Sequence, residues 1–295
     1  MRKFIVVSML LLAASAGIAG AAPSGIPGAS GTIFVTERTT NPAISSVGAL
    51  DAATGEVLWT SPTGPNPIGV TRPHGTGRVY TSDENANRIS VFDARTGAFL
   101  HVIPMGSRPH HLMASRNGNF IYVGEFGQNT VGVVDTSSDV EVAHYAASAN
   151  PSARTHAVWI SNDGATLYAT NAVANTISKL DAGTGALVWE LPIGNNPSEI
   201  LVTPDDKLAY VSVRNEHRIK VVDVSGEAPV VIGEAEANSQ PDTLSLSERR
   251  QYTRRRPACF AYRSSPRRPD RYGDADDPLR GDARPHDHGS PVAVG

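Results

Sequence analysis

Several features are scarce or absent in this chain, and each absence excludes a class of protein. Cys259 is the single cysteine in 295 residues, so an intrachain disulfide is impossible. The longest apolar run, from Phe4 to Ala14, is shorter than the roughly 20 residues that a membrane-spanning helix needs. There is no Gly-x-Ser-x-Gly elbow, P-loop or dinucleotide fingerprint, so the hydrolase and nucleotide-binding classes that carry those motifs have no support.

Basic side chains are also scarce between residues 22 and 247. This segment holds 13 Lys and Arg against 22 Asp and Glu, a net charge of −9. Binding to a phosphate backbone draws on clustered Lys and Arg. We therefore predict no nucleic-acid partner.

The N-terminus has the pattern of an export signal. Arg2 and Lys3 precede the apolar run, and small residues follow at 19–21. We expect a signal peptide over residues 1–21, cleaved near Ala21 or Ala22, and a periplasmic or secreted product without a transmembrane segment after cleavage. An uncleaved membrane anchor is the alternative.

A unit of about 40–50 residues repeats along the chain, which is typical of a β-propeller. Its clearest marker is an aspartate that closes a hydrophobic run, with gaps of 42, 42, 46 and 42 residues between Asp51, Asp93, Asp135, Asp181 and Asp223. A second marker is a proline nearly in phase with it, at Pro67, Pro109, Pro151, Pro197 and Pro241. We predict an all-β propeller of four-stranded blades over residues 32–247, with about five blades recognisable.

The unit that opens at Pro109 shows how one blade is built. Strands are predicted at 110–115, 119–125, 130–135 and 140–145, separated by turn residues such as Asn117-Gly118. The repeated aspartates end the third strands, where each carboxylate can accept bonds from turn amides two residues on. We interpret all five as structural turn caps, and a metal array is the alternative.

Tyr-Val-Thr-Asn-like strands carry a family resemblance, as in Tyr122-Val123-Gly124 and Tyr168-Ala169-Thr170-Asn171. With Asn129-Thr130-Val131 and Gly106-Ser-Arg-Pro109-His110, the pattern resembles the YVTN-type repeat family of seven-bladed β-propellers, many of them exported bacterial proteins. The resemblance implies seven blades, more than residues 32–247 provide. Relatives in the wider superfamily include lactone-hydrolysing enzymes and redox-enzyme subunits.

A second resemblance rests on Asp51-Ala-Ala-Thr54-Gly55-Glu-Val-Leu-Trp59 and on Asp181-Ala-Gly-Thr184-Gly185-Ala-Leu-Val-Trp189. These segments are similar to the tryptophan-docking repeats of quinoprotein dehydrogenase propellers. In that family the tryptophan is structural, and the cofactor pocket has no visible counterpart here. A quinoprotein-like redox protein is one alternative for the function of this chain, and its cofactor is unknown.

The residues that start the innermost strands should line the central channel. Four extra residues before Tyr168 place Thr155-His156 in phase with Pro109-His110. The candidate ligand or metal residues at the channel mouth are imidazoles and carboxylates, the donor types that bind divalent metals: His110, His111, His156, Glu199 and Asp242. Four further histidines are predicted to lie in turns or outer strands at the surface: His74, His101, His144 and His217.

The last 48 residues differ from the rest of the chain. They hold 11 of the 22 arginines, no Ile or Lys, and seven acidic residues. Such a composition cannot bury enough apolar surface to fold, so residues 248–295 are predicted to be a disordered extension. A basic nucleic-acid tail is a second hypothesis, opposed by the acidic residues. A third is a frameshift near Ser247, since Arg, Pro, Ala, Gly and Asp dominate a GC-rich gene that is read out of frame.

Together these patterns predict an exported binding or scaffold module for a protein, a glycan or a small ligand. No catalytic residue is assigned. The alternative is a channel-mouth hydrolase, lactonase-like or metal-assisted, with His110, His111 and Glu199 as ligands or bases.

Overall fold

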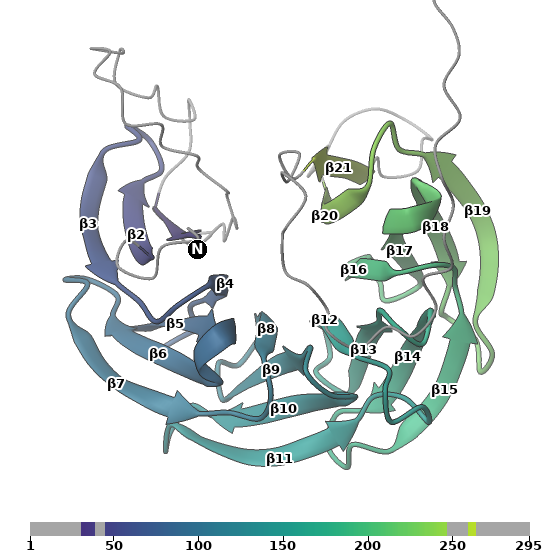
Figure 1. Cartoon of the computed structure of the whole chain (residues 1–295), viewed down its shortest axis with the longest axis horizontal. Helices are drawn as coiled ribbons and strands as arrows, with labels where there is room; N and C mark the ends of the chain where they lie inside the picture. Colours follow the sequence, from purple (N-terminus) through teal and green to yellow (C-terminus); the bar gives the residue numbers. More distant parts are fainter. Residues whose placement is uncertain (1–30, 39–44, 247–258, 264–295) are drawn as a thin grey trace, which may run out of the picture. The chain divides into compact units, whose positions relative to one another are not determined.

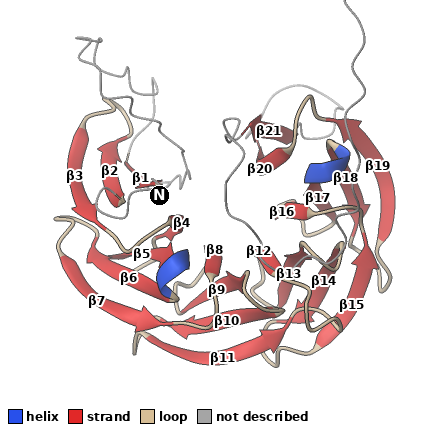
Figure 2. Ribbon diagram, in the orientation of Figure 1, coloured by secondary structure: helices blue, strands red, loops and turns tan. Residues whose placement is uncertain are grey.

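The computed structural model describes residues 31–38, 45–246 and 259–263, all of which belong to one compact unit. Among the described residues, strands form nearly all of the regular structure, and the two helical elements are short 3-10 turns, η2 (Glu84–Ala86) and η3 (Arg214–Glu216) (Figure 2). In these ranges no helix is long and apolar enough to cross a membrane. The predicted signal peptide lies outside the described residues.

The strands pair into antiparallel sheets that follow one another in chain order (Figure 1), and we number these sheets as blades. Blade 1 contains β1 (Thr32–Glu37), β2 (Ser46–Asp51) and β3 (Val57–Pro62). Blade 2 contains β4 (Pro67–Thr71), β5 (Arg78–Asp83), β6 (Arg88–Asp93) and β7 (Phe99–Pro104). Blade 3 contains β8 (Pro109–Ala114), β9 (Phe120–Glu125), β10 (Thr130–Asp135) and β11 (Val140–Ala146).

The later blades repeat this order. Blade 4 contains β12 (Thr155–Ile160), β13 (Thr166–Asn171), β14 (Thr176–Asp181) and β15 (Leu187–Pro192). Blade 5 contains β16 (Pro197–Val202), β17 (Leu208–Val213), β18 (Arg218–Asp223) and β19 (Val230–Glu236). Blade 6 contains β20 (Pro241–Leu246) and β21 (Cys259–Arg263). The predicted β-propeller of four-stranded blades is confirmed, with four complete blades among the described residues.

Apolar side chains of successive blades meet in hydrophobic clusters. Between blades 3 and 4, Tyr122 and Val131 lie in one cluster with Val158 and Leu167. The middle strands are buried on both faces, as expected for sheets stacked on both sides. The aromatic residue of each repeat therefore fills the space between blades.

Each of the five repeated aspartates accepts hydrogen bonds from the turn that follows its strand. Asp51 Oδ1 accepts from the amides of Ala53 and Thr54 at 2.9 and 2.8 Å, and from Thr54 Oγ1. The same pattern recurs at Asp93, Asp135, Asp181 and Asp223. These bonds lower the pKa of each carboxyl, because they favour its charged form.

In every blade from 1 to 5 except blade 3, a hydroxyl links the blade to the next one; it lies near the end of the second strand, or of β1 in blade 1. Ser82 of β5 accepts a bond from Gly69 N–H at 2.8 Å and donates to His110 O of β8 at 2.5 Å. The register shift in β4 takes the Gly69 N–H out of the strand ladder, so the hydroxyl is its partner. Equivalent bonds run from Thr36 to Ile68 O, from Thr170 to Ser198 O and from Ser212 to Asp242 O. These hydroxyl links fix the first strand of each following blade.

Blade 3 is the exception to this pattern, because Gly124 stands at the hydroxyl position. A Cβ atom on Gly124 would lie 2.6 Å from the carbonyl oxygen of His156 in β12. Contacts of that length do not occur, so only glycine fits between these two backbones. Blades 3 and 4 therefore approach more closely here than a side chain would allow.

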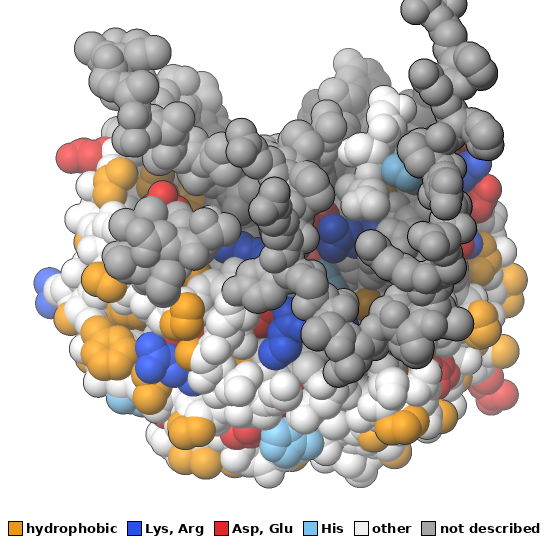
Figure 3. Space-filling view, viewed as in Figure 1, with side chains coloured by type: hydrophobic (Ala, Val, Ile, Leu, Met, Phe, Trp, Pro, Cys, Tyr) orange, Lys and Arg blue, Asp and Glu red, His pale blue; other side chains and the backbone are white. Residues whose placement is uncertain are grey.

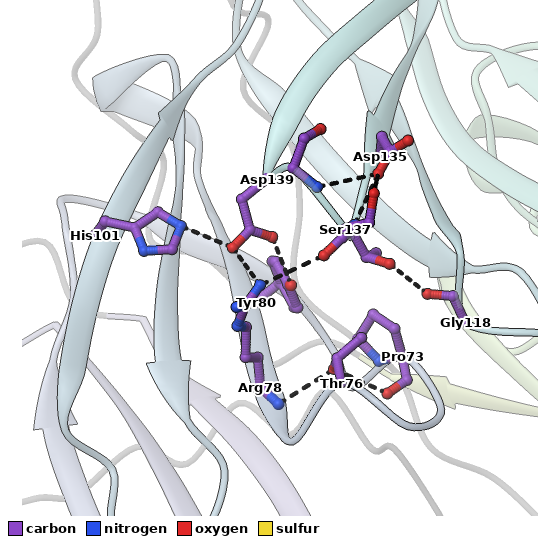
Figure 4. A network of polar contacts seen from close by, with 11 residues as sticks. Pro73, Thr76, Arg78, Tyr80, His101, Gly118, Asp135, Ser137 and Asp139 are labelled. Carbon is purple, nitrogen blue, oxygen red and sulfur yellow. Dashed lines mark hydrogen bonds and ion pairs between the residues drawn. The ribbon is translucent and has the colours of Figure 1, made fainter.

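A polar network joins the outer parts of blades 2 and 3 (Figure 4). Asp139, in the turn between β10 and β11, accepts bonds from Arg78 Nη1 at 2.6 Å and from the Tyr80 hydroxyl at 2.8 Å. His101 Nε2 lies 2.9 Å from the same carboxylate. His101 is on the outer strand β7, as predicted, but it belongs to this network and is only partly exposed. Burial raises the pKa of Tyr80, so its hydroxyl stays protonated as the donor.

The tryptophan of the second resemblance also contacts a neighbouring blade. Trp59 Nε1 in β3 donates to Ala94 O at 3.2 Å, and a Cβ atom on Gly97 would lie 2.6 Å from the Trp59 ring. Trp59 therefore docks blade 1 on the β6–β7 turn of blade 2. This contact joins the two blades through one hydrogen bond and close packing of the ring.

One strand lies within the segment predicted to be disordered. β21 pairs antiparallel with β20, with Cys259 opposite Leu246. The structure differs from the expected disorder at these five residues, because their backbone pairs with β20. The rest of residues 248–295 lies outside the described part of the chain, so disorder and a frameshift stay predictions there.

Candidate functional site

The five predicted site residues all stand near the start of first strands. His110 and His111 are in β8, His156 is in β12, Glu199 is in β16 and Asp242 is in β20. Thr155 pairs with Asn171 in blade 4, and Pro109 pairs with Glu125 at the same position in blade 3. This confirms that the four extra residues place Thr155 in phase with Pro109. The structure sorts the five into two groups of contacts.

The first group, which we term the aromatic cluster, consists of His110, His156 and Phe126. The ring centroids of His110 and His156 are 4.1 Å apart, although the two residues come from different blades. Phe126, which follows β9, lies 5.5 Å from His110 and 5.4 Å from His156. Sequence reasoning named the two histidines and missed Phe126, which directly follows the predicted second strand.

Hydrogen bonds define the state of these imidazoles. His156 Nδ1 lies 2.8 Å from Ser198 O, and a carbonyl only accepts, so Nδ1 carries the proton. His110 Nδ1 is buried and has no hydrogen-bond partner among the described residues. Burial, together with the neighbouring cationic groups, lowers the pKa of His110 well below its ordinary value. His110 is therefore neutral at pH 7, with one buried ring nitrogen still able to bind a ligand.

Two arginines flank the aromatic cluster. Arg108 Cζ lies 5.0 Å from the Phe126 ring centroid, and Arg154 Cζ lies 5.8 Å from it. Arg108 Nη2 also pairs with Glu84 Oε1 at 2.6 Å, whereas exposed Arg154 forms no ion pair with another described residue. On the face shown in Figure 3, Lys and Arg side chains lie near the middle as well as at the outer edge.

Both arginines have a left-handed backbone, with φ of 54° at Arg108 and 56° at Arg154. The equivalent positions before β4 and β16 are Asn66 and Asn196, and asparagine adopts this conformation readily. Arginine gains no such local compensation, and such strain costs on the order of 1 kcal/mol or more. Non-Gly residues held in this way cluster at functional sites, which directs attention to this edge of blades 3 and 4.

The second group joins His111, Glu199 and Asp242. His111 Nε2 lies 3.6 Å from Glu199 Oε1, and Arg214 Nη1 lies 3.4 Å from Asp242 Oδ1. Burial, followed by the charge of His156, lowers the pKa of His111 to about 4. Burial, followed by the charge of Asp242, raises the pKa of Glu199 well above its ordinary value. The contact between His111 and Glu199 thus joins two uncharged groups over a wide range of pH.

The raised pKa of Glu199 predicts a pH-dependent effect of Glu199→Gln. As pH rises above the ordinary value of 4.5, the unfolded chain loses this proton before the folded chain does, so the wild-type fold loses stability. The amide cannot ionise and avoids this loss. Glu199→Gln should match the wild type near pH 4.5 and exceed it at pH 8 by on the order of 1 kcal/mol, or roughly 2–4 °C in Tm.

Thermal unfolding of both proteins at the two pH values measures this difference. The exposed Glu227→Gln is the matched control and should change Tm little at either pH. A Glu199→Gln variant that is less stable than the wild type at pH 8 would show that the Glu199 carboxyl is ionised in the folded protein.

A third group was not predicted at all. Within the described residues, the three acidic or imidazole side chains whose ligand atoms all lie within 4.8 Å of one another are Glu125, Glu141 and His144. Burial, followed by the charge of Glu125, raises the pKa of Glu141 to about 7. His144 was predicted to lie at the surface, and its side chain is 46% exposed, yet it contacts both carboxylates. Only the register of the outer strand β11 brings the three together.

Comparisons with known proteins agree with the fold. The sequence model of the YNCE-like beta-propeller family matches residues 75–234. No curated protein matches the chain.

Among solved structures, the chain is similar to a functionally unknown protein from Desulfotomaculum acetoxidans. The two share 16% identity with a TM-score of 0.60, over 72% of this chain and 68% of that one. It is also similar to a proposed 6-phosphogluconolactonase from Bacteroides uniformis, at 17% identity and a TM-score of 0.55, over 71% and 83% of the two chains. A hydrazine synthase from Kuenenia stuttgartiensis matches at 17% identity and a TM-score of 0.50, over 73% and 86%. At these identities the likeness concerns the fold alone.

Proposed function

This chain belongs to the YNCE-like beta-propeller family, and on that premise we propose that its blades bind a small anionic ligand. The ligand is a phosphate or carboxylate compound, held over the aromatic cluster between Arg108 and Arg154. The proposal rests on two observations: the buried Nδ1 of His110 has no hydrogen-bond partner among the described residues, and Arg154, beside the same Phe126 ring, forms no ion pair with any of them.

Charge at this edge favours an anion over a cation. Two guanidinium groups flank the Phe126 ring, and Glu84 neutralises only the one on Arg108. Burial is the main cause of the lowered pKa of His110, and the charges of His156, His111, Arg38 and Arg108 lower it further. Arginine presents a planar array of donors that matches carboxylate and phosphate oxygens. The sequence also suggested a metal ion here, but the positive charges of the two arginines would repel a cation.

Neutral donors complete the site. A neutral His110 can donate from one ring nitrogen, and the uncharged carboxyl of Glu199 can donate to a hydroxyl or carbonyl oxygen. A compound with an anionic group and several hydroxyls, such as a sugar acid, therefore fits this set of donors. The proposal is a binding function, and export to the periplasm or medium remains part of it as a prediction.

Hydrolysis is not included in the proposal. A general base works best when its pKa lies near the working pH. The pKa of His111 is about 4, which makes it a weak base, and Glu199 keeps its proton and cannot act as one. The pair therefore suits hydrogen bonding better than proton abstraction.

Charge reversal at Arg154 tests the proposal. Calorimetric titration with inorganic phosphate and with gluconate, at low ionic strength, should show saturable binding to the wild type. Arg154→Glu should weaken it at least about tenfold, which corresponds to roughly 1.4 kcal/mol. The exposed side chain of Arg154 forms no hydrogen bond or ion pair with a described residue, and its backbone bond from Ala172 N–H does not depend on the side chain, so the variant should keep the wild-type Tm.

Arg116→Glu is the matched control, since Arg116 is also an exposed arginine and lies beyond the end of β8 that is opposite to Arg108. It makes the same change in net charge and should leave binding unchanged. An equal loss of affinity in the two variants would contradict a site at Arg154, because it would follow from the change in net charge alone. Failure of the wild type to bind either anion would also overturn the proposal.

A further inference from the structure

We propose that Glu125, Glu141 and His144 form a binding site for one divalent transition metal ion, Zn²⁺ or Mn²⁺, within blade 3. This site is separate from the aromatic cluster and does not depend on the proposed anion binding. Two carboxylates and one imidazole are a donor set that these ions accept.

The three side chains already face one another. His144 Nδ1 lies 3.0 Å from Glu125 Oε2, and His144 Nε2 lies 3.5 Å from Glu141 Oε2. A metal-binding histidine commonly donates its second ring nitrogen to a carboxylate, which fixes the ring. The Nδ1 contact with Glu125 provides this arrangement and leaves Nε2 directed toward Glu141.

Two carboxylate oxygens in the cluster have no hydrogen-bond partner among the described residues. Glu125 is fully buried, and its Oε1 forms no hydrogen bond with a described residue, nor does Oε1 of Glu141. By contrast, Glu125 Oε2 accepts bonds from Gln128 Nε2 at 2.8 Å and from Thr130 Oγ1 at 2.5 Å. A buried carboxylate oxygen without a donor is costly. A cation bound between the carboxylates would supply the missing partner to both.

Two glycines leave the space in which these oxygens lie. A Cβ atom on Gly106 would be 2.0 Å from Glu125 Oε1, and one on Gly132 would be 2.6 Å from Glu141 Oε1. Gly106 lies between β7 and β8, and Gly132 is in β10. Any larger residue at either position would fill the cluster, so the local sequence keeps it open.

The other blades show that this arrangement is a departure from the repeat. The second strands of blades 2, 3 and 4 each end in a residue with a polar side chain. In blades 2 and 4, a serine of the third strand forms a hydrogen bond with that side chain. Ser90 donates to Asp83 in blade 2, and Asn171 donates to Ser178 in blade 4. In blade 3 the third-strand position is Gly132, and His144 stands opposite it.

Glu141 departs from the repeat as well. It pairs with Val134 across the bulge in β11, and the equivalent positions in the other blades are apolar: Val57, Phe99, Leu187 and Val231. Blade 3 therefore replaces one hydroxyl and one apolar residue with an imidazole and a second carboxylate. The half-exposed His144 side chain leaves the cluster open to ions from solvent.

The alternative occupant of this cluster is a single proton shared by the two carboxyls. Metal titration separates the two. The full chain should carry the background change His286→Ala and His288→Ala, because a His-x-His pair in the C-terminal segment could bind metal independently. After treatment with a chelator and dialysis, calorimetric titration with Zn²⁺ and with Mn²⁺ should show one saturable site.

His144→Gln and Glu141→Gln should each weaken this binding at least about tenfold. Glu234→Gln is the matched control, because Glu234 occupies the outer-strand position in blade 5 that corresponds to His144. Circular dichroism checks that each variant is folded. The metal should also raise the Tm of the wild type and of Glu234→Gln, and not that of the two ligand variants.

Absence of a site in the parent protein would overturn the proposal and leave the shared proton as the occupant. Binding that survives His144→Gln and Glu141→Gln unchanged would overturn it too, since the ion would then lie elsewhere. Neither result would affect the anion-binding proposal, which is tested with different ligands and different residues.

Discussion

Ser82→Ala should destabilise the protein by about 2–4 kcal/mol, one of the two largest effects that this structure predicts. The Ser82 hydroxyl is fully buried, accepts the Gly69 N–H and donates to His110 O. Its loss leaves a buried donor and a buried acceptor without partners, each at a cost of about 1–3 kcal/mol. Thermal unfolding should show a Tm lowered by roughly 5–10 °C.

The matched control for this substitution is Ser152→Ala. Ser152 is exposed in the connection before β12, so loss of its hydroxyl should stay within about 0.5 kcal/mol. Because Ser82 holds the His110 backbone, the first variant should also weaken phosphate binding, whereas the control should not. Similar Tm values for the two variants would mean that the hydroxyl links do not hold the blades together.

Gly124→Ser should destabilise the protein by about 2–4 kcal/mol, although the repeat suggests the opposite. Thr36, Ser82, Thr170 and Ser212 occupy the same position in other blades, so serine would seem to restore a missing hydroxyl link. The Cβ atom, however, would lie 2.6 Å from His156 O, so the backbone of β12 would have to move. That movement should also separate the His110 and His156 rings.

Gly233→Ser provides the control for this prediction. Gly233 is an exposed strand glycine of β19, and nothing lies within 4 Å of a Cβ atom built on it. Its replacement should change Tm by no more than about 2 °C in either direction. A Gly124→Ser protein as stable as the wild type would show that blades 3 and 4 can move apart without cost.

Most of the fold could be predicted because its signals are local. An aspartate followed by small or hydroxyl-bearing turn residues forms a turn with little help from its surroundings. The five repeated aspartates therefore placed the ends of their strands correctly. The alternation of apolar residues placed the strands of blade 3 to within about one residue. The repeat also explained the four extra residues before Tyr168, which put Thr155 in phase with Pro109.

The candidate sites depend on contacts between blades, which local sequence patterns do not predict. His110 and His156 were both named, but their 4.1 Å contact depends on how closely blades 3 and 4 approach at Gly124. The left-handed backbone of Arg108 and Arg154 is imposed by the loop, since arginine itself does not favour it. These features arise from contacts between blades, which a single repeat cannot reveal.

His144 lies on its predicted outer strand and its side chain is 46% exposed, as predicted, but the sequence did not show that it contacts two carboxylates. Its outer strand was predicted, and an outer strand normally exposes its side chains. The bulge in β11, opposite the step from Val133 to Val134 in β10, sets Glu141 and His144 against Glu125, and the absence of a side chain at Gly132 makes room for them. Aligning the blades by strand register would have shown that both residues depart from the repeat.

The most direct test of the central claim is a spectrum of the full chain labelled with ¹⁵N at histidine, recorded with and without inorganic phosphate. The account predicts that the ring signals of His110 and His156 shift and saturate together, while those of His74 and His217 do not change. It further predicts that Arg154→Glu removes the shift. Unchanged signals for His110 and His156 at saturating phosphate would contradict the anion site, and with it the function proposed for these blades.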